Sequence, residues 1–212
     1  MEKILTELGA FLADSGVDWA VCGGWALELF LGRETRVHGD LDLSVPEAHR
    51  ERIQRFMLER GWLVYEFRGQ GRLRPLSADV PSEPGRNLMC LRAGCELVTF
   101  WPCDEPDMVL HEWHSAGIRE LNYMEFLFRE RPAFFGRSPD RAIIRAGGLP
   151  YLAPEVVLRY KAAEPERAAN RADFAAAFPA LSPERRGWLM DSLRGQYAGG
   201  HPWLAGEETR DA

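Results

Sequence analysis

Two aspartates separated by a single residue are the part of this chain most suited to bind a hard metal ion. Asp40 and Asp42 alternate with apolar residues in the run Asp-Leu-Asp-Leu-Ser-Val, which predicts a strand over residues 40–45. One face of that strand is apolar, and the other carries both carboxylates, roughly 6.5–7 Å apart. Mg²⁺ is often held by one or two carboxylates together with substrate phosphates. Taken alone, the pair also fits a strand with one face in water.

A glycine pair precedes the aspartates and favours the chemical interpretation. Residues 18–22 predict a short buried strand and residues 25–31 a helix, with Gly23 and Gly24 between them. A strand, two glycines and a helix let the backbone approach a ligand and direct free N–H groups at an anion. The chain contains neither GxxxxGK[ST] nor GxGxxG. A phosphate site followed by two carboxylates is what the transfer of a nucleotidyl group from a triphosphate requires.

The complete motif reads Gly-Gly-Trp-Ala, a helix ending in Leu-Gly, and then Thr-Arg-x-His-x-Asp-x-Asp. It resembles the nucleotidyltransferase superfamily related to DNA polymerase beta and, more narrowly, the aminoglycoside 2''-nucleotidyltransferases and their uncharacterised bacterial relatives. Glu28 stands where these relatives often have Asp. The matching residues are Gly23, Gly24, Trp25, Ala26, Leu31, Gly32, Thr35, Arg36, His38, Asp40 and Asp42.

The resemblance implies that Asp40 and Asp42 bind two Mg²⁺ ions and that the helix start, with Gly23, Gly24 and Trp25, holds the triphosphate. Arg36 and His38 lie in the loop that leads into the acidic strand. Both are candidates for the nucleotide site, and we interpret His38 as a hydrogen-bonding support rather than a catalyst.

A third carboxylate is usual in that superfamily, and our candidate is Glu96, as a metal ligand or general base. Residues 87–101 contain two apolar runs joined at Ala93-Gly94, which predicts a hairpin with Glu96 at the head of its second strand. Another register places Thr99 there, in which case Asp104 or Glu105 is an alternative base. Glu96 also fits a solvated hairpin residue.

A second zone of resemblance lies near the C-terminus, in Leu-Pro-Tyr-Leu-Ala-Pro-Glu-Val-Val-Leu-Arg-Tyr-Lys-Ala and the Arg-x-Asp-Phe that follows. Pro154 fits the first turn of a helix. The resemblance implies that Lys161 contacts a phosphate and that Asp173 orients Lys161 or the acceptor. The alternative is a surface lysine with an apolar stem and an acid on a helix face.

The expected fold is a mixed α/β (α+β) polymerase-beta-like nucleotidyltransferase sheet with flanking helices and a C-terminal helical annex. We expect a nucleotidyltransferase core over residues 1–150, a helical subdomain over 151–204 and a flexible tail over 205–212. Helices are predicted at about 47–60, 154–163, 168–178 and 182–196, and further strands at 62–67 and 141–145.

Composition agrees with a small-molecule enzyme. The 212 residues are 46% hydrophobic, enough for a core, and the formal net charge of −6 makes an extended nucleic-acid surface unlikely. No apolar run reaches the ~18–20 residues of a membrane span, and acidic residues interrupt the N-terminal segment, so we expect a cytoplasmic protein without a signal peptide. A zinc site of Cys95, Cys103, His111 and His114 matches no common spacing.

The expected reaction moves AMP from ATP onto a hydroxyl of a small molecule, with an aminoglycoside antibiotic, and hence resistance, as the first choice of acceptor. Two alternatives stay open at this level. One is a toxin-like nucleotidyltransferase acting on RNA or protein, and the other is a nucleotide-binding relative with impaired catalysis.

Overall fold

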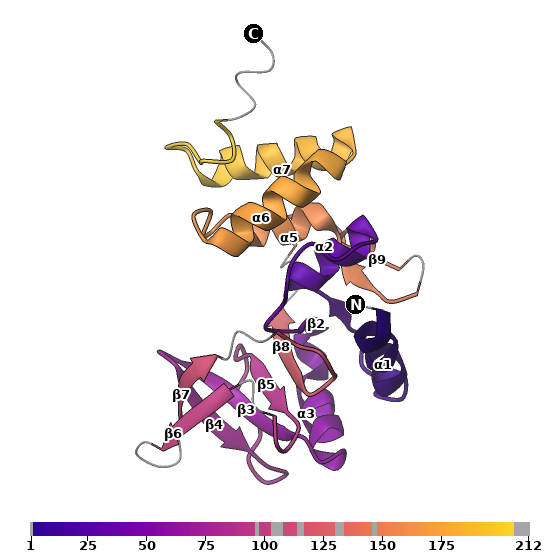
Figure 1. The fold of residues 1–212 in the computed structure, drawn as a ribbon, viewed down its shortest axis with the longest axis vertical. Helices are drawn as coiled ribbons and strands as arrows, with labels where there is room; N and C mark the ends of the chain where they lie inside the picture. The colour runs from indigo at the N-terminus through magenta and orange to yellow at the C-terminus, as the bar shows by residue number, and fades with distance from the viewer. Residues whose placement is uncertain are drawn as a thin grey trace.

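The computed structural model describes residues 2–95, 98–102, 108–113, 117–129, 134–145 and 148–205. Over these residues the chain is a mixed α/β structure, as expected. Figure 1 shows the sheet in one half of the molecule and α5, α6 and α7 stacked in the other, with α2 between them. The strands are β1 (Ala20–Val21), β2 (Asp42–Pro46), β3 (Leu63–Gly69), β4 (Arg72–Leu76), β5 (Leu88–Leu91), β6 (Val98–Pro102), β7 (Met108–Trp113), β8 (Tyr123–Arg129), β9 (Ile143–Ile144) and β10 (Tyr151–Leu152).

The helices follow the apolar periodicity of the sequence, with boundaries shifted by a few residues. Pro154 occupies the first turn of its helix, as predicted. The α-helices are α1 (Glu2–Leu12), α2 (Gly23–Leu31), α3 (Arg50–Glu59), α4 (Pro139–Ala142), α5 (Pro154–Lys161), α6 (Ala168–Ala177) and α7 (Pro183–Gln196), and short 3-10 helices span Glu47–His49 and Phe178–Ala180.

The acidic strand β2 lies inside the sheet, whose order is β6-β7-β4-β3-β5-β8-β2-β1-β10-β9. It runs antiparallel to β1 and parallel to β8. Leu41, Leu43 and Val45 are almost completely buried, whereas Asp40 and Asp42 are partly exposed. The predicted alternation is therefore present over residues 40–43, whereas Ser44 is buried, and the regular strand begins only at Asp42.

The prediction of a hairpin around Ala93-Gly94 is wrong, because the two strands on either side of this turn do not pair with each other. Both apolar runs contain strands, but β5 pairs with β3 and β8, and β6 pairs with β7. The physical reason is that β5 finds hydrogen-bonding partners on both of its edges. Its residues Leu88 to Leu91 are all buried, so the strand sits in the interior of the sheet instead of forming one arm of an isolated hairpin.

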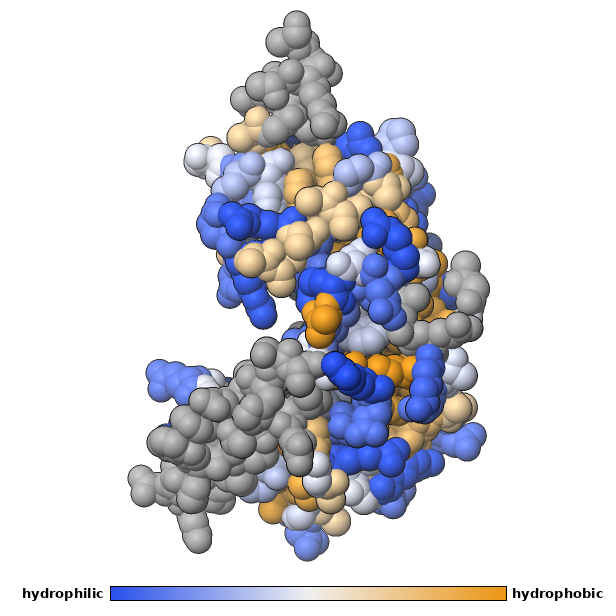
Figure 2. All heavy atoms as spheres, viewed as in Figure 1, coloured by the Kyte–Doolittle hydropathy of each residue, from blue (hydrophilic) through white to orange (hydrophobic). Residues whose placement is uncertain are grey.

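The C-terminal helices join the sheet half of the molecule through α2, because α5 and α6 both contact that helix. The sheet continues past residue 150, since Tyr151 of β10 pairs with Val21 of β1. Figure 2 shows that the surface is hollowed on this face between the helical half and the sheet half. The division at residue 150 and the tail beyond 204 stay predictions, and residues 206–212 lie outside the described part of the chain.

Candidate nucleotide and metal site

The start of α2 and the acidic strand are in direct contact. Gly23 opens α2 with a φ of 64°, and a Cβ built on it would collide with the Asp42 carboxylate. The backbone N–H of Cys22 donates to the Asp42 carbonyl oxygen at 2.8 Å, which fixes the spacing of the two segments. Only glycine satisfies both the left-handed backbone and the close approach of the carboxylate. The structure therefore brings the predicted glycine pair and the second aspartate together.

This contact predicts the effect of Gly23→Ala. The added methyl group meets both a strained φ and the Asp42 side chain, so we expect a loss of roughly 1–3 kcal/mol of stability and displacement of that carboxylate. Gly32→Ala is the matched control, because Gly32 has a φ of 65° but nothing within 4 Å of the place its Cβ would take. Unfolding curves and Mg²⁺-dependent ATP binding are measured on both variants. Equal loss of binding in the two would contradict a special role for Gly23.

A third carboxylate, which was not among the residues predicted from the sequence, is Glu125 of β8. In the parallel ladder between β2 and β8, Glu125 is the partner of Asp42, and paired residues project from the same face of a sheet. The hydroxyl of Tyr123 donates to the Glu125 carboxylate. In sequence Glu125 is the one acid in the strand Tyr-Met-Glu-Phe-Leu-Phe-Arg. An acid among the apolar and aromatic residues of this strand was the sequence signal for a functional residue. Its pairing with Asp42 could not be predicted from the sequence, because the two residues lie on strands far apart in the chain.

Negative charge accumulates around Glu125. Burial, and then the nearby Asp42 and Asp40 carboxylates, raise the pKa of Glu125 to about 8, against the opposing effect of the Tyr123 hydrogen bond. Burial and the Glu125 carboxylate also raise the pKa of Tyr123. Such a shift reports carboxylates that repel one another in a poorly hydrated place.

A divalent cation fits this donor set, because its positive charge would stabilise the ionised Glu125 against the burial, and then the repulsion by Asp42 and Asp40, that raise the pKa of Glu125. Carboxylate oxygens are the ligands that Mg²⁺ prefers. Within the ranges described, no three His, Cys, Asp or Glu side chains converge closely enough to ligate one ion. Asp40, Asp42 and Glu125 therefore interact through their charges and do not form a closed coordination shell.

Gly23 and Asp42 line a cavity of about 250 Å³. Lys161 and Asn170 line its helical side, and Leu127 and Tyr160 contribute apolar surface. Lys161 and Gly23 of α2 therefore line the same cavity, and the phosphate contact implied for Lys161 stays a prediction. A cationic wall facing a glycine turn and a carboxylate suits a bound phosphate chain.

Asp173 lies behind Lys161 and binds two cations. Lys161 Nζ is 2.8 Å from Asp173 Oδ2. The guanidinium of Arg36 donates to both oxygens of Asp173, from Nε at 2.9 Å and from Nη2 at 3.0 Å. Burial opposes ionisation of Asp173, but Arg36 and Lys161 outweigh it and hold the pKa of this carboxyl below its usual range. Arg36 therefore engages Asp173 and does not project freely into the cavity.

His38 and Trp25 support the loop that precedes Asp40. The two rings lie 4.9 Å apart, and Trp25 Nε1 donates to the Asp40 carbonyl oxygen at 2.8 Å. His38 is 4% exposed, and burial lowers the pKa of its imidazole. A Cβ on Gly24 would lie 2.6 Å from His38 Nδ1, so the second glycine makes room for this ring. The geometry is that of a supporting histidine.

The predicted third carboxylate, Glu96, lies outside the described residues, as do the alternative bases Asp104 and Glu105. Thr99 falls in β6, a strand at the end of the sheet order. The structure therefore neither joins Glu96 to the site nor removes it, and Glu125 is the acid that it places beside Asp42.

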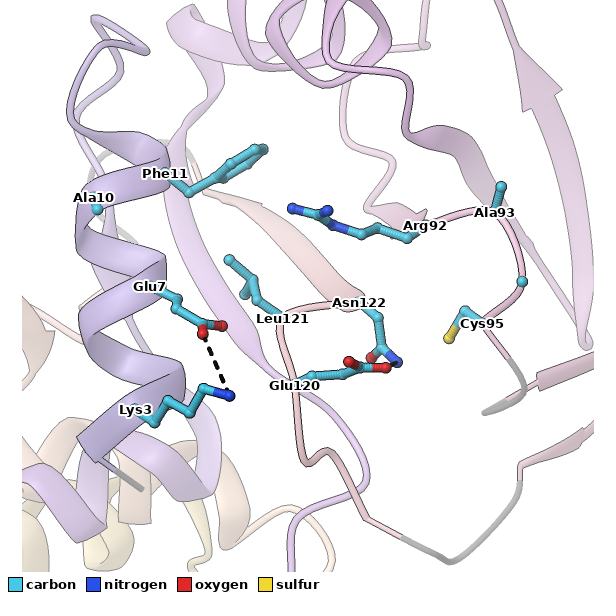
Figure 3. Close-up of a pocket in the computed structure, with 11 residues that line it drawn as sticks. Lys3, Glu7, Ala10, Phe11, Arg92, Ala93, Cys95, Glu120, Leu121 and Asn122 are labelled. Carbon is cyan, nitrogen blue, oxygen red and sulfur yellow. Dashed lines mark hydrogen bonds and ion pairs between the residues drawn. The ribbon is translucent and has the colours of Figure 1, made fainter.

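A second cavity of about 520 Å³ lies between α1 and the residues that flank β5 and β8. Figure 3 shows an open, mixed-charge space in which Lys3 and Glu7 pair with each other on α1. None of the predicted site residues lines it. Its other labelled lining residues are Ala10, Phe11, Arg92, Ala93, Cys95, Glu120, Leu121 and Asn122.

Comparison with known proteins gives matches in sequence and in structure. The family model described as Aminoglycoside-2''-adenylyltransferase matches residues 4–73. The solution structure of the antibiotic-resistance factor ANT(2'')-Ia superposes with a TM-score of 0.54 at 14% identity, over 92% of this chain and 91% of that chain. The crystal structure of ANT(2'')-Ia in complex with adenylyl-2''-tobramycin gives a TM-score of 0.52 at 15% identity, over 91% and 96%. No curated protein sequence matches significantly.

The chain has a nucleotidyltransferase fold, in which the Gly23 turn and the carboxylates of Asp42 and Glu125 lie together. More narrowly, it resembles the aminoglycoside nucleotidyltransferases, as the family match over residues 4–73 and the two ANT(2'')-Ia structures indicate. No helix among the residues described is long and apolar enough to cross a membrane.

Proposed function

We propose that this chain is a Mg²⁺-dependent nucleotidyltransferase that moves AMP from ATP onto a hydroxyl of a small molecule, with an aminoglycoside as the first acceptor to test. The observation that carries the proposal is the cluster of Asp40, Asp42 and Glu125 beside Gly23 and a cavity lined by Lys161. Similarity to ANT(2'')-Ia, solved with an adenylylated tobramycin, supports the choice of acceptor class.

Each group has a role in this reaction. Asp40, Asp42 and Glu125 would hold the metal, which when bound supplies positive charge beside the phosphates. The start of α2 offers backbone N–H groups to the phosphate chain, and Lys161 neutralises charge on the departing pyrophosphate. Positioning and charge neutralisation supply nearly all of the rate in such a site.

The bond changes balance with the residues named. The acceptor hydroxyl oxygen attacks the α-phosphorus of ATP, a new phosphoester bond forms, and the bond between the α-phosphorus and the bridging oxygen breaks to release pyrophosphate. Glu125 lies beside Asp42 and accepts the hydroxyl proton in its ionised form. We propose Glu125 for the part first assigned to Glu96, because its position beside Asp42 supports it.

The testing experiment is pyrophosphate release from each of four nucleoside triphosphates, with Mg²⁺ and a panel of aminoglycosides, lincosamides and tRNA. We expect ATP with an aminoglycoside to give product whose mass rises by one adenylyl group. Pyrophosphate release with tRNA and with no small molecule of the panel would contradict a small-molecule acceptor and indicate a nucleic-acid acceptor. ATP–Mg²⁺ binding without release on any acceptor would leave a nucleotide-binding protein and contradict the transferase.

A further inference from the structure

Another buried acid, Glu28, lies on α2. The side chain of Glu28 is 1% exposed. Its Oε1 accepts hydrogen bonds from the Thr35 backbone N–H at 2.7 Å, the Thr35 hydroxyl at 3.1 Å and the Arg36 backbone N–H at 3.3 Å. His38 Nε2 lies 2.8 Å from the same oxygen. A buried charge requires such compensation, and here every partner comes from the loop between α2 and β2.

The loop that Glu28 holds carries Arg36 to the helical half of the molecule. The bidentate pair between Arg36 and Asp173 joins this loop to α6. On its other side, the Arg36 guanidinium packs against the start of α2, where a Cβ on Gly24 would lie 2.5 Å from Nη2. The planar guanidinium of Arg36 has little freedom, because it is held by Asp173 on one side and by Gly24 on the other. The backbone position of residues 35–38 therefore determines where Arg36 binds the Asp173 carboxylate.

Asp173 connects Arg36 to Lys161, which lines the cavity. Its Oδ2 binds Arg36 Nη2 and Lys161 Nζ together. Asn170 also accepts from Lys161 Nζ at 3.3 Å and ties the end of α5 by donating to the carbonyl oxygens of Lys161 and Glu164. Arg36, Lys161 and Asp173 together carry one net positive charge. Of these three, Lys161 lines the cavity, together with Arg167, Glu164 and Asp42. An ammonium group held beside the Gly23 turn is suited to contact a phosphate.

We propose that Glu28 is a positioning residue of the triphosphate site: through the loop of residues 35–38, Arg36 and Asp173, it sets the place of Lys161 Nζ. Glu28 itself does not line the cavity beside Lys161. This inference rests on the proposed function, because it takes the ligand of that cavity to be a phosphate chain.

The test is a double-mutant cycle read with Mg²⁺ and inorganic tripolyphosphate by titration calorimetry. Glu28→Gln keeps the shape of the side chain but loses its charge, and we expect the Kd to rise about tenfold. In a Lys161→Ala background the same substitution should change the Kd by less than about twofold, because the residue through which it acts is gone. Glu34→Gln, an exposed acid in the same loop, is the matched control and should leave the Kd unchanged.

Arg36→Lys is a second variant that keeps the charge but loses the bidentate fork, and it should show the same dependence on Lys161. The ¹⁵N signal of the Lys161 ammonium, recorded without ligand, should shift in both variants. Additive losses in the cycle, or an unshifted ammonium signal, would overturn the inference and leave Glu28 as a support of the fold alone. If the unmodified protein binds no tripolyphosphate, the proposed function itself fails.

Discussion

The variant that combines Asp40→Asn with Asp42→Asn is expected to lose Mg²⁺-dependent ATP binding while keeping its fold. Both side chains are partly exposed, and their charges contribute to the raised pKa of Glu125, so removing them relieves repulsion in the free protein. We expect the melting temperature to stay the same or to rise. Pyrophosphate release should fall by on the order of 10³-fold or more, because the metal ligands are lost.

The matched control for this variant is Asp14→Asn with Asp18→Asn, which removes two charges from exposed positions near β1. Asp18 is half-exposed and pairs with Arg145, so its loss should cost little stability. ATP binding is measured by titration calorimetry with Mg²⁺ and again with EDTA. If the Asp40 and Asp42 variant binds ATP–Mg²⁺ as tightly as the unmodified protein, the metal site lies elsewhere.

The local part of the site could be predicted from the sequence because it is carried by two neighbouring segments. Alternation of Asp40 and Asp42 with leucines determines which face of β2 is polar, and Gly23 allows the turn that brings α2 against Asp42. These features depend on sequence periods and backbone freedom, both of which a single chain displays.

The non-local part could not be predicted in the same way. Glu125 reaches Asp42 only because β8 pairs in parallel with β2, and a parallel register depends on connections far along the chain. The hairpin prediction around Ala93-Gly94 failed for the same reason: a glycine turn between apolar runs indicates a reversal, whereas β5 takes its partners from β3 and β8. The ion pairs of Asp173 also join segments that no local pattern relates.

Glu125→Gln is expected to make the metal-free protein more stable at alkaline pH and, at the same time, inactive. In the folded protein the pKa of Glu125 is raised to about 8 by burial and by Asp42 and Asp40, from the ordinary value of 4.5. The folded state therefore holds its proton more tightly than the unfolded state does. The stability from that proton is fully present below about pH 4.5 and is lost as pH rises through 8.

The substitution removes this loss because glutamine does not ionise, while its amide oxygen still accepts from the Tyr123 hydroxyl. The free energy of unfolding is measured with urea in the presence of EDTA. Between pH 5 and pH 8.5, the free energy of unfolding of the variant should rise relative to that of the unmodified protein by roughly 2–5 kcal/mol. Glu120→Gln, at an exposed acid ahead of β8, should show no such trend. Mg²⁺ should narrow the difference at pH 8.5, because a cation beside Asp42 stabilises the ionised Glu125 and can bind only after its proton leaves. A difference in stability that stays constant with pH would mean that Glu125 is ionised throughout this range. Its pKa would then not be raised by burial and by Asp42 and Asp40, and the site would lack the excess of negative charge that favours a cation.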